Sequence, residues 1–354
     1  MGLEMKKLVL IPQPRYLFLF FFFVISIQLK AESKRDTLVN VAVRDTFKLR
    51  KAQVFETETA SMVYYRPKPF QFLKYVPADI AGLGKAAVSK KNLPTMGAIA
   101  AGTLALILVD QPITDAAQQF GRYIHLDPAR KSRTLLQFNI GNFNVKAMEA
   151  PDNLSSSIYY LGEGWASMLI AGGFYTYGLA AKDYRAIQTT SQITEMIFAL
   201  GITTQFLKRI SGRQSPFRAM EDTNPTPGGK WHPLTSPAKY QESVSNYDAF
   251  PSGHLATAMA TITILSGNYP DNKYIKPVGY TLMGLLGYSM LNNGVHWVSD
   301  YPLAIAIGYT CGKIALARGR TMLPKSGAEH GAFSSFAPTY MGNGTLGFSY
   351  RVVF

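Results

Sequence analysis

The stretch that decides the fold runs Ala249-Phe250-Pro251-Ser252-Gly253-His254-Leu255-Ala256-Thr257-Ala258. Pro251 and Ser252 are residue types that begin helices, and the alanine-rich run after them predicts a helix. The unpaired backbone N–H groups at such a helix start favour an anion, and Gly253 permits its close approach. His254 would then lie beside that anion. The alternative interpretation is an ordinary helix cap with a bystander histidine.

A second histidine occurs in the segment Asn292-Asn293-Gly294-Val295-His296-Trp297-Val298-Ser299-Asp300. The Asn-Asn-Gly sequence is typical of a turn and precedes a predicted helix. His296 and Asp300 are four residues apart, which would place them on one helical face. A carboxylate there can keep one ring nitrogen protonated and leave the other as a nucleophile or base. The alternative is a surface pair without a chemical role.

A basic cluster follows the predicted helix that begins at Tyr184. Lys208 is succeeded by Arg209-Ile210-Ser211-Gly212-Arg213-Gln214-Ser215-Pro216. Cations at a helix C-terminus offset the helix dipole, which is one explanation of the cluster. The other is that a phosphoryl group needs several fixed cationic donors.

Apolar segments rich in Ala, Leu, Ile, Met and Gly recur along the chain, and each is long enough for a helix. They are Met96–Val109, Ile158–Ala181, Tyr184–Leu207, His254–Ser266, Val278–Leu291 and Trp297–Ala317. The pattern predicts an all-α bundle of about six core helices. A membrane-spanning helix needs about 20 mostly apolar residues, and several segments are shorter or contain a charge such as Glu163 or Glu195. We therefore expect a membrane-associated bundle, with a soluble exported bundle as the alternative.

The N-terminus has the order of a secretory signal. Lys6, Lys7 and Arg15 precede an apolar block, Tyr16 to Ile27, and small residues follow near Ala31. We expect residues 1–31 to be a signal peptide or an uncleaved anchor. Export places the protein in the cell envelope, outside the cytoplasm and associated with the membrane, or soluble in the periplasm.

The remaining boundaries follow from composition. Residues 32–92 are polar at first and predict a partly irregular N-terminal arm, residues 93–320 form the helical bundle, and residues 321–354 form a tail. In the tail, alternating apolar side chains follow the turn sequence Gly342-Asn343-Gly344; they are Leu346, Phe348, Tyr350, Val352 and Phe354. This alternation predicts a short C-terminal β-hairpin, which we expect to pack on the bundle.

Composition narrows the class of protein. The 354 residues are 47% hydrophobic and 16% charged, which suits one main domain with a large core. The net charge of +14 favours anionic partners. Because basic residues occur in short groups beside apolar segments, not in a stripe with exposed aromatics, we do not expect nucleic-acid binding. The single Cys311 excludes an intrachain disulfide, and no metal-ligand spacing occurs around the isolated His125, His232 and His330.

Taken together, in this order and spacing, the three polar segments resemble the type 2 phosphatidic acid phosphatase superfamily, which also includes bacterial acid phosphatases and vanadium haloperoxidases. Its motifs are a Lys followed seven residues later by Arg-Pro, then Pro-Ser-Gly-His, then Ser-Arg with a His six residues after the Arg and an Asp four further on. The matching positions in this chain are Lys208, Pro216, Pro251 to His254, Ser289, His296 and Asp300.

The resemblance implies an acid phosphatase/vanadium haloperoxidase-like bundle and a phosphatase without metal or cofactor. His296 would attack phosphorus to form a phosphohistidine, with Asp300 fixing its tautomer. His254 would protonate the leaving alcohol and then activate water. Lys208 and the backbone amides around Ser252 and Gly253 would stabilise the phosphoryl oxygens. The implied partner is a phosphorylated lipid, a polyprenyl diphosphate or a small phosphate ester, at a membrane.

Two positions depart from the family pattern. Ser215 and Met290 stand where the family has arginines that grip the phosphate, and each lost charged hydrogen bond costs about 1.5–3 kcal/mol. Arg213 is the candidate compensating cation, with Arg209 and Arg218 nearby. The alternative function is a catalytically weakened member that binds anionic lipid or has a structural role. A vanadate-dependent haloperoxidase is less expected, because it depends on tight oxyanion binding.

Overall fold

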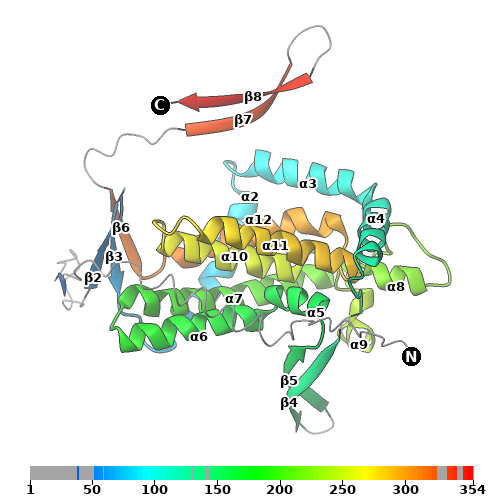
Figure 1. The fold of residues 1–354 in the computed structure, drawn as a ribbon, viewed down its shortest axis with the longest axis horizontal. Helices are drawn as coiled ribbons and strands as arrows, with labels where there is room; N and C mark the ends of the chain where they lie inside the picture. Colours follow the sequence, from blue (N-terminus) through cyan, green and yellow to red (C-terminus); the bar gives the residue numbers. More distant parts are fainter. Residues whose placement is uncertain are drawn as a thin grey trace, which may run out of the picture.

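The computed structural model describes residues 38–39, 52–58, 60–129, 131–140, 143–324, 333–340 and 346–353. Within these ranges the chain is mainly α-helical, which confirms the predicted helical bundle (Figure 1). The predicted signal peptide or anchor, residues 1–31, lies outside the described residues.

Five long helices form the body of the bundle. They are α6 (Gly164–Ala180), α7 (Tyr184–Ser211), α10 (Gly253–Asn268), α11 (Ile275–Asn292) and α12 (Tyr301–Leu316). Ile193 and Met196 of α7 pack with Ile264 of α10 in a fully buried core. Helices α10 and α12 pack tightly at Gly308, where an added Cβ would lie 2.2 Å from the carbonyl oxygen of Ala256. The absence of a side chain at Gly308 therefore sets the distance between these two helices.

The ends of α7 and α10 are fixed by local chemistry. Asp183 caps α7 by accepting a hydrogen bond from the Ala186 amide at 2.8 Å. Gly212 ends the same helix with a φ of 55°, in the left-handed region that favours glycine. Ser252 caps α10, with its Oγ 3.5 Å from the Leu255 amide, as the sequence predicted. Gly212 and Ser252 thus fix the positions of the last turn of α7 and the first turn of α10.

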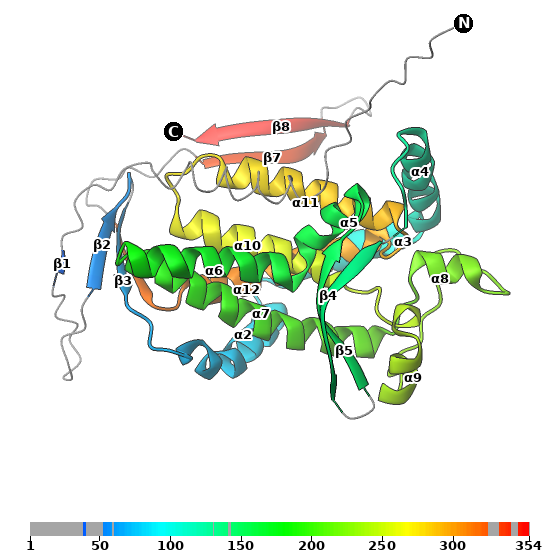
Figure 2. The same ribbon diagram turned by 60° about the horizontal axis from the view of Figure 1, so that its bottom comes forward.

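Shorter helices surround the body (Figure 2). The α-helices are α2 (Val76–Val88), α3 (Leu93–Ile107), α4 (Asp110–Tyr123), α5 (Leu154–Tyr159), α8 (Pro216–Glu221) and α9 (Pro237–Glu242). Short 3-10 helices occur at η1 (Gln71–Lys74), η2 (Tyr160–Gly162), η3 (Val244–Asn246) and η4 (Val298–Asp300). The connection between the first two motifs thus contains α8 and α9.

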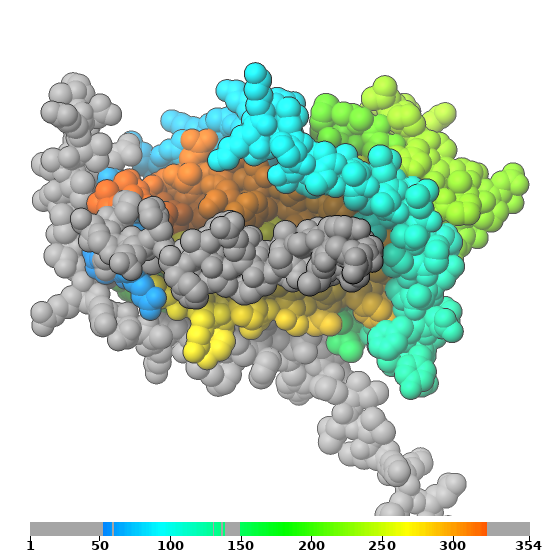
Figure 3. Space-filling model, turned by 90° about the horizontal axis from the view of Figure 1, so that it is seen from above, coloured from blue at the N-terminus to red at the C-terminus, as the bar shows by residue number. Residues whose placement is uncertain are grey.

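Helices α3 and α4 lie at the surface, where Figure 3 shows them as a continuous cyan band along one edge of the molecule. Among the described residues, no helix taken singly has both the length and the apolar character of a membrane span. Helices α3 and α4 together meet those two criteria, although they are bent by 67° at their junction.

An antiparallel sheet closes one end of the bundle. Its strands are β1 (Leu38–Val39), β2 (Ala52–Glu56), β3 (Ala60–Tyr65) and β6 (Arg320–Pro324), in the order β1-β2-β3-β6. This sheet was not predicted from the sequence, because residues 32–92 are polar at first and show no sustained period. Gln53 of β2 is nevertheless buried, because both atoms of its side-chain amide are hydrogen-bonded. Its Nε2 donates to the Lys182 carbonyl at 2.8 Å, and its Oε1 accepts from the Tyr184 backbone amide at 2.6 Å.

The described residues also contain two β-hairpins. One pairs β4 (Ser132–Ile140) with β5 (Phe143–Pro151) and was not predicted from the sequence. The other pairs β7 (Phe333–Tyr340) with β8 (Leu346–Val353) and confirms the predicted C-terminal hairpin. Its turn, Gly342-Asn343-Gly344, and its side chains lie outside what the structure describes, so its packing on the bundle stays a prediction.

Candidate active site

His296 is buried in the link between α11 and α12. The prediction that it shares a helical face with Asp300 is wrong, because α12 begins only at Tyr301 and the 3-10 turn η4 precedes it. The Asp300 carboxylate shapes this turn by accepting a hydrogen bond from the Trp297 amide at 2.7 Å. The spacing of four residues therefore reflects a capped turn, not a turn of α-helix.

The hydrogen bonds of His296 select its tautomer. Its Nδ1 lies 2.6 Å from the Ala249 carbonyl oxygen and 3.4 Å from Oδ2 of Asp300. A carbonyl only accepts hydrogen bonds, so Nδ1 carries the hydrogen and Nε2 keeps its lone pair. Burial lowers the pKa of His296; Asp300 opposes this, whereas Lys208 and His254 lower it further. The site is thus built for a neutral imidazole.

His254 lies in the first turn of α10, with its ring centroid 6.1 Å from that of His296. Oε1 of Glu163 lies 3.2 Å from its Nε2, and the ring of Tyr159 contacts it at a centroid distance of 4.3 Å. An ionised carboxylate only accepts hydrogen bonds, so Glu163 can hold a proton on Nε2 and orient the ring. Glu163 and Tyr159 were not predicted as site residues, because they come from the α5–α6 region, remote in sequence from His254.

Lys208 lies in the last turn of α7, and its side chain is buried. Its Nζ is 3.5 Å from Oδ2 of Asp248 and 3.9 Å from where a Cβ would lie on Gly253. Gly253 is the first residue of α10, where a backbone amide has no intrahelical acceptor. The cation and the helix start therefore meet, as an anion site requires.

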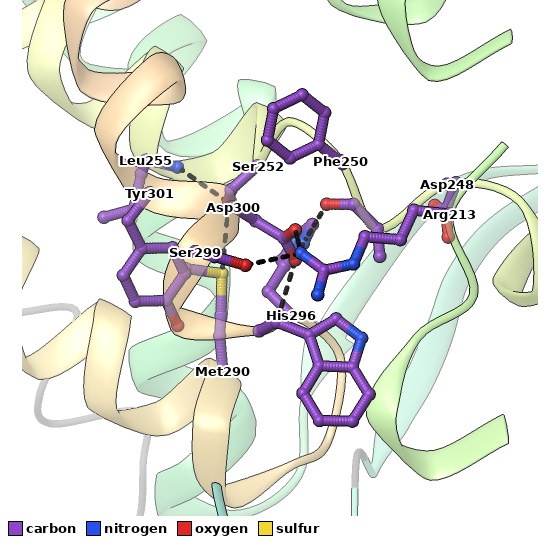
Figure 4. Close-up of polar contacts among 12 residues, drawn as sticks. Arg213, Asp248, Phe250, Ser252, Leu255, Met290, His296, Ser299, Asp300 and Tyr301 are labelled. Atoms are coloured by element: carbon purple, nitrogen blue, oxygen red, sulfur yellow. Dashed lines mark hydrogen bonds and ion pairs between the residues drawn. The ribbon is translucent and has the colours of Figure 1, made fainter. Parts of the chain in front are cut away.

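Ser252 has structural bonds at both of its polar groups. Its amide donates to the Asp300 carbonyl at 3.2 Å, and its hydroxyl caps α10. That hydroxyl also lies 3.7 Å from Sδ of Met290, which is fully buried beside it (Figure 4). Met290 thus packs at the start of α10, in one of the positions where the family pattern has an arginine.

Ser215 occupies the other such position and is also buried. Its amide donates to the Ser245 carbonyl at 3.0 Å. Within the described part of the chain its hydroxyl has no hydrogen-bond partner. A small side chain with an unused polar group therefore replaces a long cation here.

The prediction that Arg213 supplies the missing cation is wrong. Its guanidinium is fully buried and forms ion pairs with Asp300 at 2.5 Å and Asp110 at 2.6 Å. Figure 4 shows it directed at Asp300 and Ser299. Nor do the neighbouring arginines replace it: Arg209 stacks on Tyr240, and Arg218 pairs with Glu221 at the surface. Lys208 is the cation that the described residues place at the start of α10.

The described residues combine three chemical functions. His296 offers a neutral imidazole with a lone pair on Nε2, and His254 is a second imidazole held by a carboxylate. Lys208 and the start of α10 provide positive potential for an anion. A nucleophile, an acid–base group and an anion site are the components of group transfer at an anionic centre.

Part of the chain is similar to known proteins. Residues 190–321 match the model of the PAP2 superfamily, and this range contains Lys208, His254, His296 and Asp300. A stretch of 68 residues is 34% identical to the lipid A 1-phosphatase of Porphyromonas gingivalis. That stretch is 19% of this chain and 15% of the relative, so the similarity spans a small part of either protein.

Two solved structures are also similar. The crystal structure of Aquifex aeolicus LpxE matches with a TM-score of 0.34 and 22% identity, over 46% of this chain and 82% of that one. The transmembrane PAP2 type phosphatidylglycerolphosphate phosphatase of Bacillus subtilis matches with a TM-score of 0.30 and 14% identity, over 70% of this chain and 94% of that one.

Proposed function

We propose that this chain, whose residues 190–321 match the model of the PAP2 superfamily, is a metal-independent phosphatase acting on phosphate esters or diphosphates of lipids. One observation carries the proposal: the Ala249 carbonyl holds the hydrogen on Nδ1 of His296 and leaves Nε2 free of it. A neutral, oriented imidazole is the nucleophile that a phosphohistidine pathway needs.

The proposed reaction has two steps. The Nε2 lone pair of His296 forms a bond to phosphorus while the bond from phosphorus to the alcohol oxygen breaks, and His254 gives its proton to that oxygen. A water molecule then attacks the phosphohistidine, His254 takes its proton, and the N–P bond breaks to release phosphate. Lys208 and the amide of Gly253 stabilise the charge on the phosphoryl oxygens in both steps.

A lipid substrate is supported by the surface of α7. Phe198, Ile202 and Phe206 recur every four residues, and their exposed fractions are 45%, 52% and 64%. They form an apolar stripe on the helix whose last turn carries Lys208. The similarity to a lipid A 1-phosphatase points to the same substrate class. With the secretory signal expected at residues 1–31, we place the reaction at a membrane surface outside the cytoplasm.

A second function is favoured by the residues at the two departures from the family pattern. Met290 and Ser215 supply no charge, and Arg213 is held by Asp110 and Asp300. A site with one cation binds phosphate more weakly than a site with three, since each charged hydrogen bond is worth about 1.5–3 kcal/mol. The alternative is therefore a weakened member of the family that binds anionic lipid.

Phosphate release from a lipid phosphate and from a chromogenic phosphate ester, with EDTA present, distinguishes these functions. We expect release by the wild-type protein and none by His296→Ala. A matched control is His125→Ala, which changes a histidine remote in sequence from the three motifs. A wild-type rate no higher than that of His296→Ala would overturn the phosphatase. Binding of phosphatidic acid vesicles without release would then establish the alternative.

A further inference from the structure

Asp110 connects the surface elbow between α3 and α4 to the site. It is the first residue of α4, yet its carboxylate is fully buried. Its Oδ1 accepts a hydrogen bond from the Ser299 amide at 3.0 Å, and its Oδ2 accepts one from the Ser299 hydroxyl at 2.5 Å. Both bonds reach η4, the turn that contains Asp300. The elbow therefore contacts the catalytic segment through one charged side chain.

Arg213 joins Asp110 to Asp300. Its Nη2 donates to Asp110 at 2.6 Å and to the Gly228 carbonyl at 2.8 Å. Its Nη1 donates to Asp300 at 2.5 Å and to the Ser299 hydroxyl at 2.6 Å, and its Nε donates to the same Gly228 carbonyl at 3.2 Å. One buried cation thus lies between two buried carboxylates, with all three of its nitrogens bonded.

We infer that Asp110 and Arg213 are positioning residues that fix the geometry and charge of Asp300, and through Asp300 the nucleophile His296. The inference rests on the proposed phosphatase function and deepens it. Arg213 bonds one carboxylate oxygen of Asp300, while the other accepts from the Trp297 amide and lies 3.4 Å from Nδ1 of His296. A shift of Arg213 would therefore rotate the carboxylate that faces the imidazole.

The charge of Asp110 also affects the pKa of His296. The charged groups that influence His296 are Asp300, Lys208 and His254, and of these Asp300 alone raises its pKa. If Asp110 became neutral, Arg213 would be balanced by Asp300 alone. The negative potential at His296 would then fall, and its pKa with it. The carboxylate on the elbow thus helps to set the pH at which the nucleophile becomes neutral.

Asp110→Asn in the full-length protein tests the inference. The matched control is Asp115→Asn, an exposed carboxylate on the same helix that bonds Gln111. We expect kcat per folded enzyme to fall about tenfold or more, because a displaced reacting group costs rate steeply. We expect KM to change little, since Asp110 lies behind the site. The acidic limb of the kcat/KM profile should move to lower pH, while Asp115→Asn leaves both parameters unchanged.

The outcomes separate the inference from the proposed function. A wild-type rate equal to that of His296→Ala refutes the phosphatase itself. An active wild type whose acidic limb stays in place in Asp110→Asn refutes the positioning role. If Asp110→Asn does not fold, Ser299→Ala replaces it, because this change keeps all three charges and removes only the bridging hydroxyl. A lower kcat with the acidic limb in place then supports the inference, and an unchanged kcat overturns it.

Discussion

Gly162 offers a direct test of how closely His254 must be positioned. This glycine ends η2, in the link between α5 and α6, and lies against the start of α10. In Gly162→Ala the new Cβ would lie 2.6 Å from Cβ of His254 and 2.7 Å from Cδ2 of Leu286. It would also lie 3.0 Å from Cα of His254, a backbone atom that a rotamer change cannot move. Carbon atoms normally pack at about 3.5–4.0 Å, so the link and the start of α10 must move apart by roughly 1 Å.

That displacement sets the expected magnitudes. Overpacking a well-packed region costs about 1–3 kcal/mol of unfolding free energy. A catalytic group displaced by about 1 Å lowers the rate by about 100-fold. We therefore expect Gly162→Ala to remain folded under assay conditions but to lose about 100-fold in kcat. The protein should lose far more activity than stability.

Gly164→Ala is the matched control, because it makes the same change two residues away, where no atom lies within 4 Å of the new Cβ. The assay compares kcat, KM and the thermal unfolding midpoint of both variants with wild type. Gly164→Ala should match wild type in all three. If Gly162→Ala is folded and its kcat is within about threefold of Gly164→Ala, the link does not position His254 and the reasoning fails.

Two further predictions concern charge. The double variant Ser215→Arg with Met290→Arg should bind inorganic phosphate at least about tenfold more tightly than wild type in competitive inhibition, since it restores charged donors. The neutral double variant Ser215→Gln with Met290→Gln is its control. Equal inhibition of the two double variants by phosphate would contradict the expectation. Burial, and then the Asp79 carboxyl, raise the pKa of Glu195 to about 10 in the folded protein. The stability that this shift contributes is fully present below the unfolded pKa of Glu195 and is lost as pH rises from there toward about 10. The melting temperature of wild type should therefore fall between about pH 5 and pH 9 more steeply than that of Glu195→Gln, and parallel curves would show that folding does not raise the pKa of Glu195.

The side chains of the candidate site could be proposed from sequence because they occur in motifs of fixed order. Lys208, His254 and His296 come from α7, α10 and the α11–α12 link, and the fold brings them together. The tautomer of His296 could not be predicted, since its closest acceptor is the backbone carbonyl of Ala249, and a carbonyl has no residue signature. The helix at Trp297 began later than predicted because the Asp300 side chain caps a tight turn first.

The partners of the site depend on contacts across long sequence separations. Glu163 lies 91 residues from His254, and Asp110 lies 189 residues from Ser299. No local pattern indicates such pairs, because each forms only when separate elements pack. Arg213 is only two residues from Ser215, yet its backbone forms β-bridges with residues of two later segments and its side chain lies between carboxylates. Its position in the sequence therefore indicated that Arg213 lies near the site, but not that its guanidinium points at Asp110 and Asp300.

The sheet at the end of the bundle has a consequence for chain connectivity. In the register of β3 and β6, Tyr64 lies opposite Arg320, so the segments that enter and leave the helical body run side by side. A short linker between these strands would close the body into a ring. New ends could then be opened in the exposed segment around Asn224, between α8 and α9. Such a circular permutant would carry α10 and η4 ahead of α7, and each of the three motifs would stay within an unbroken stretch of chain.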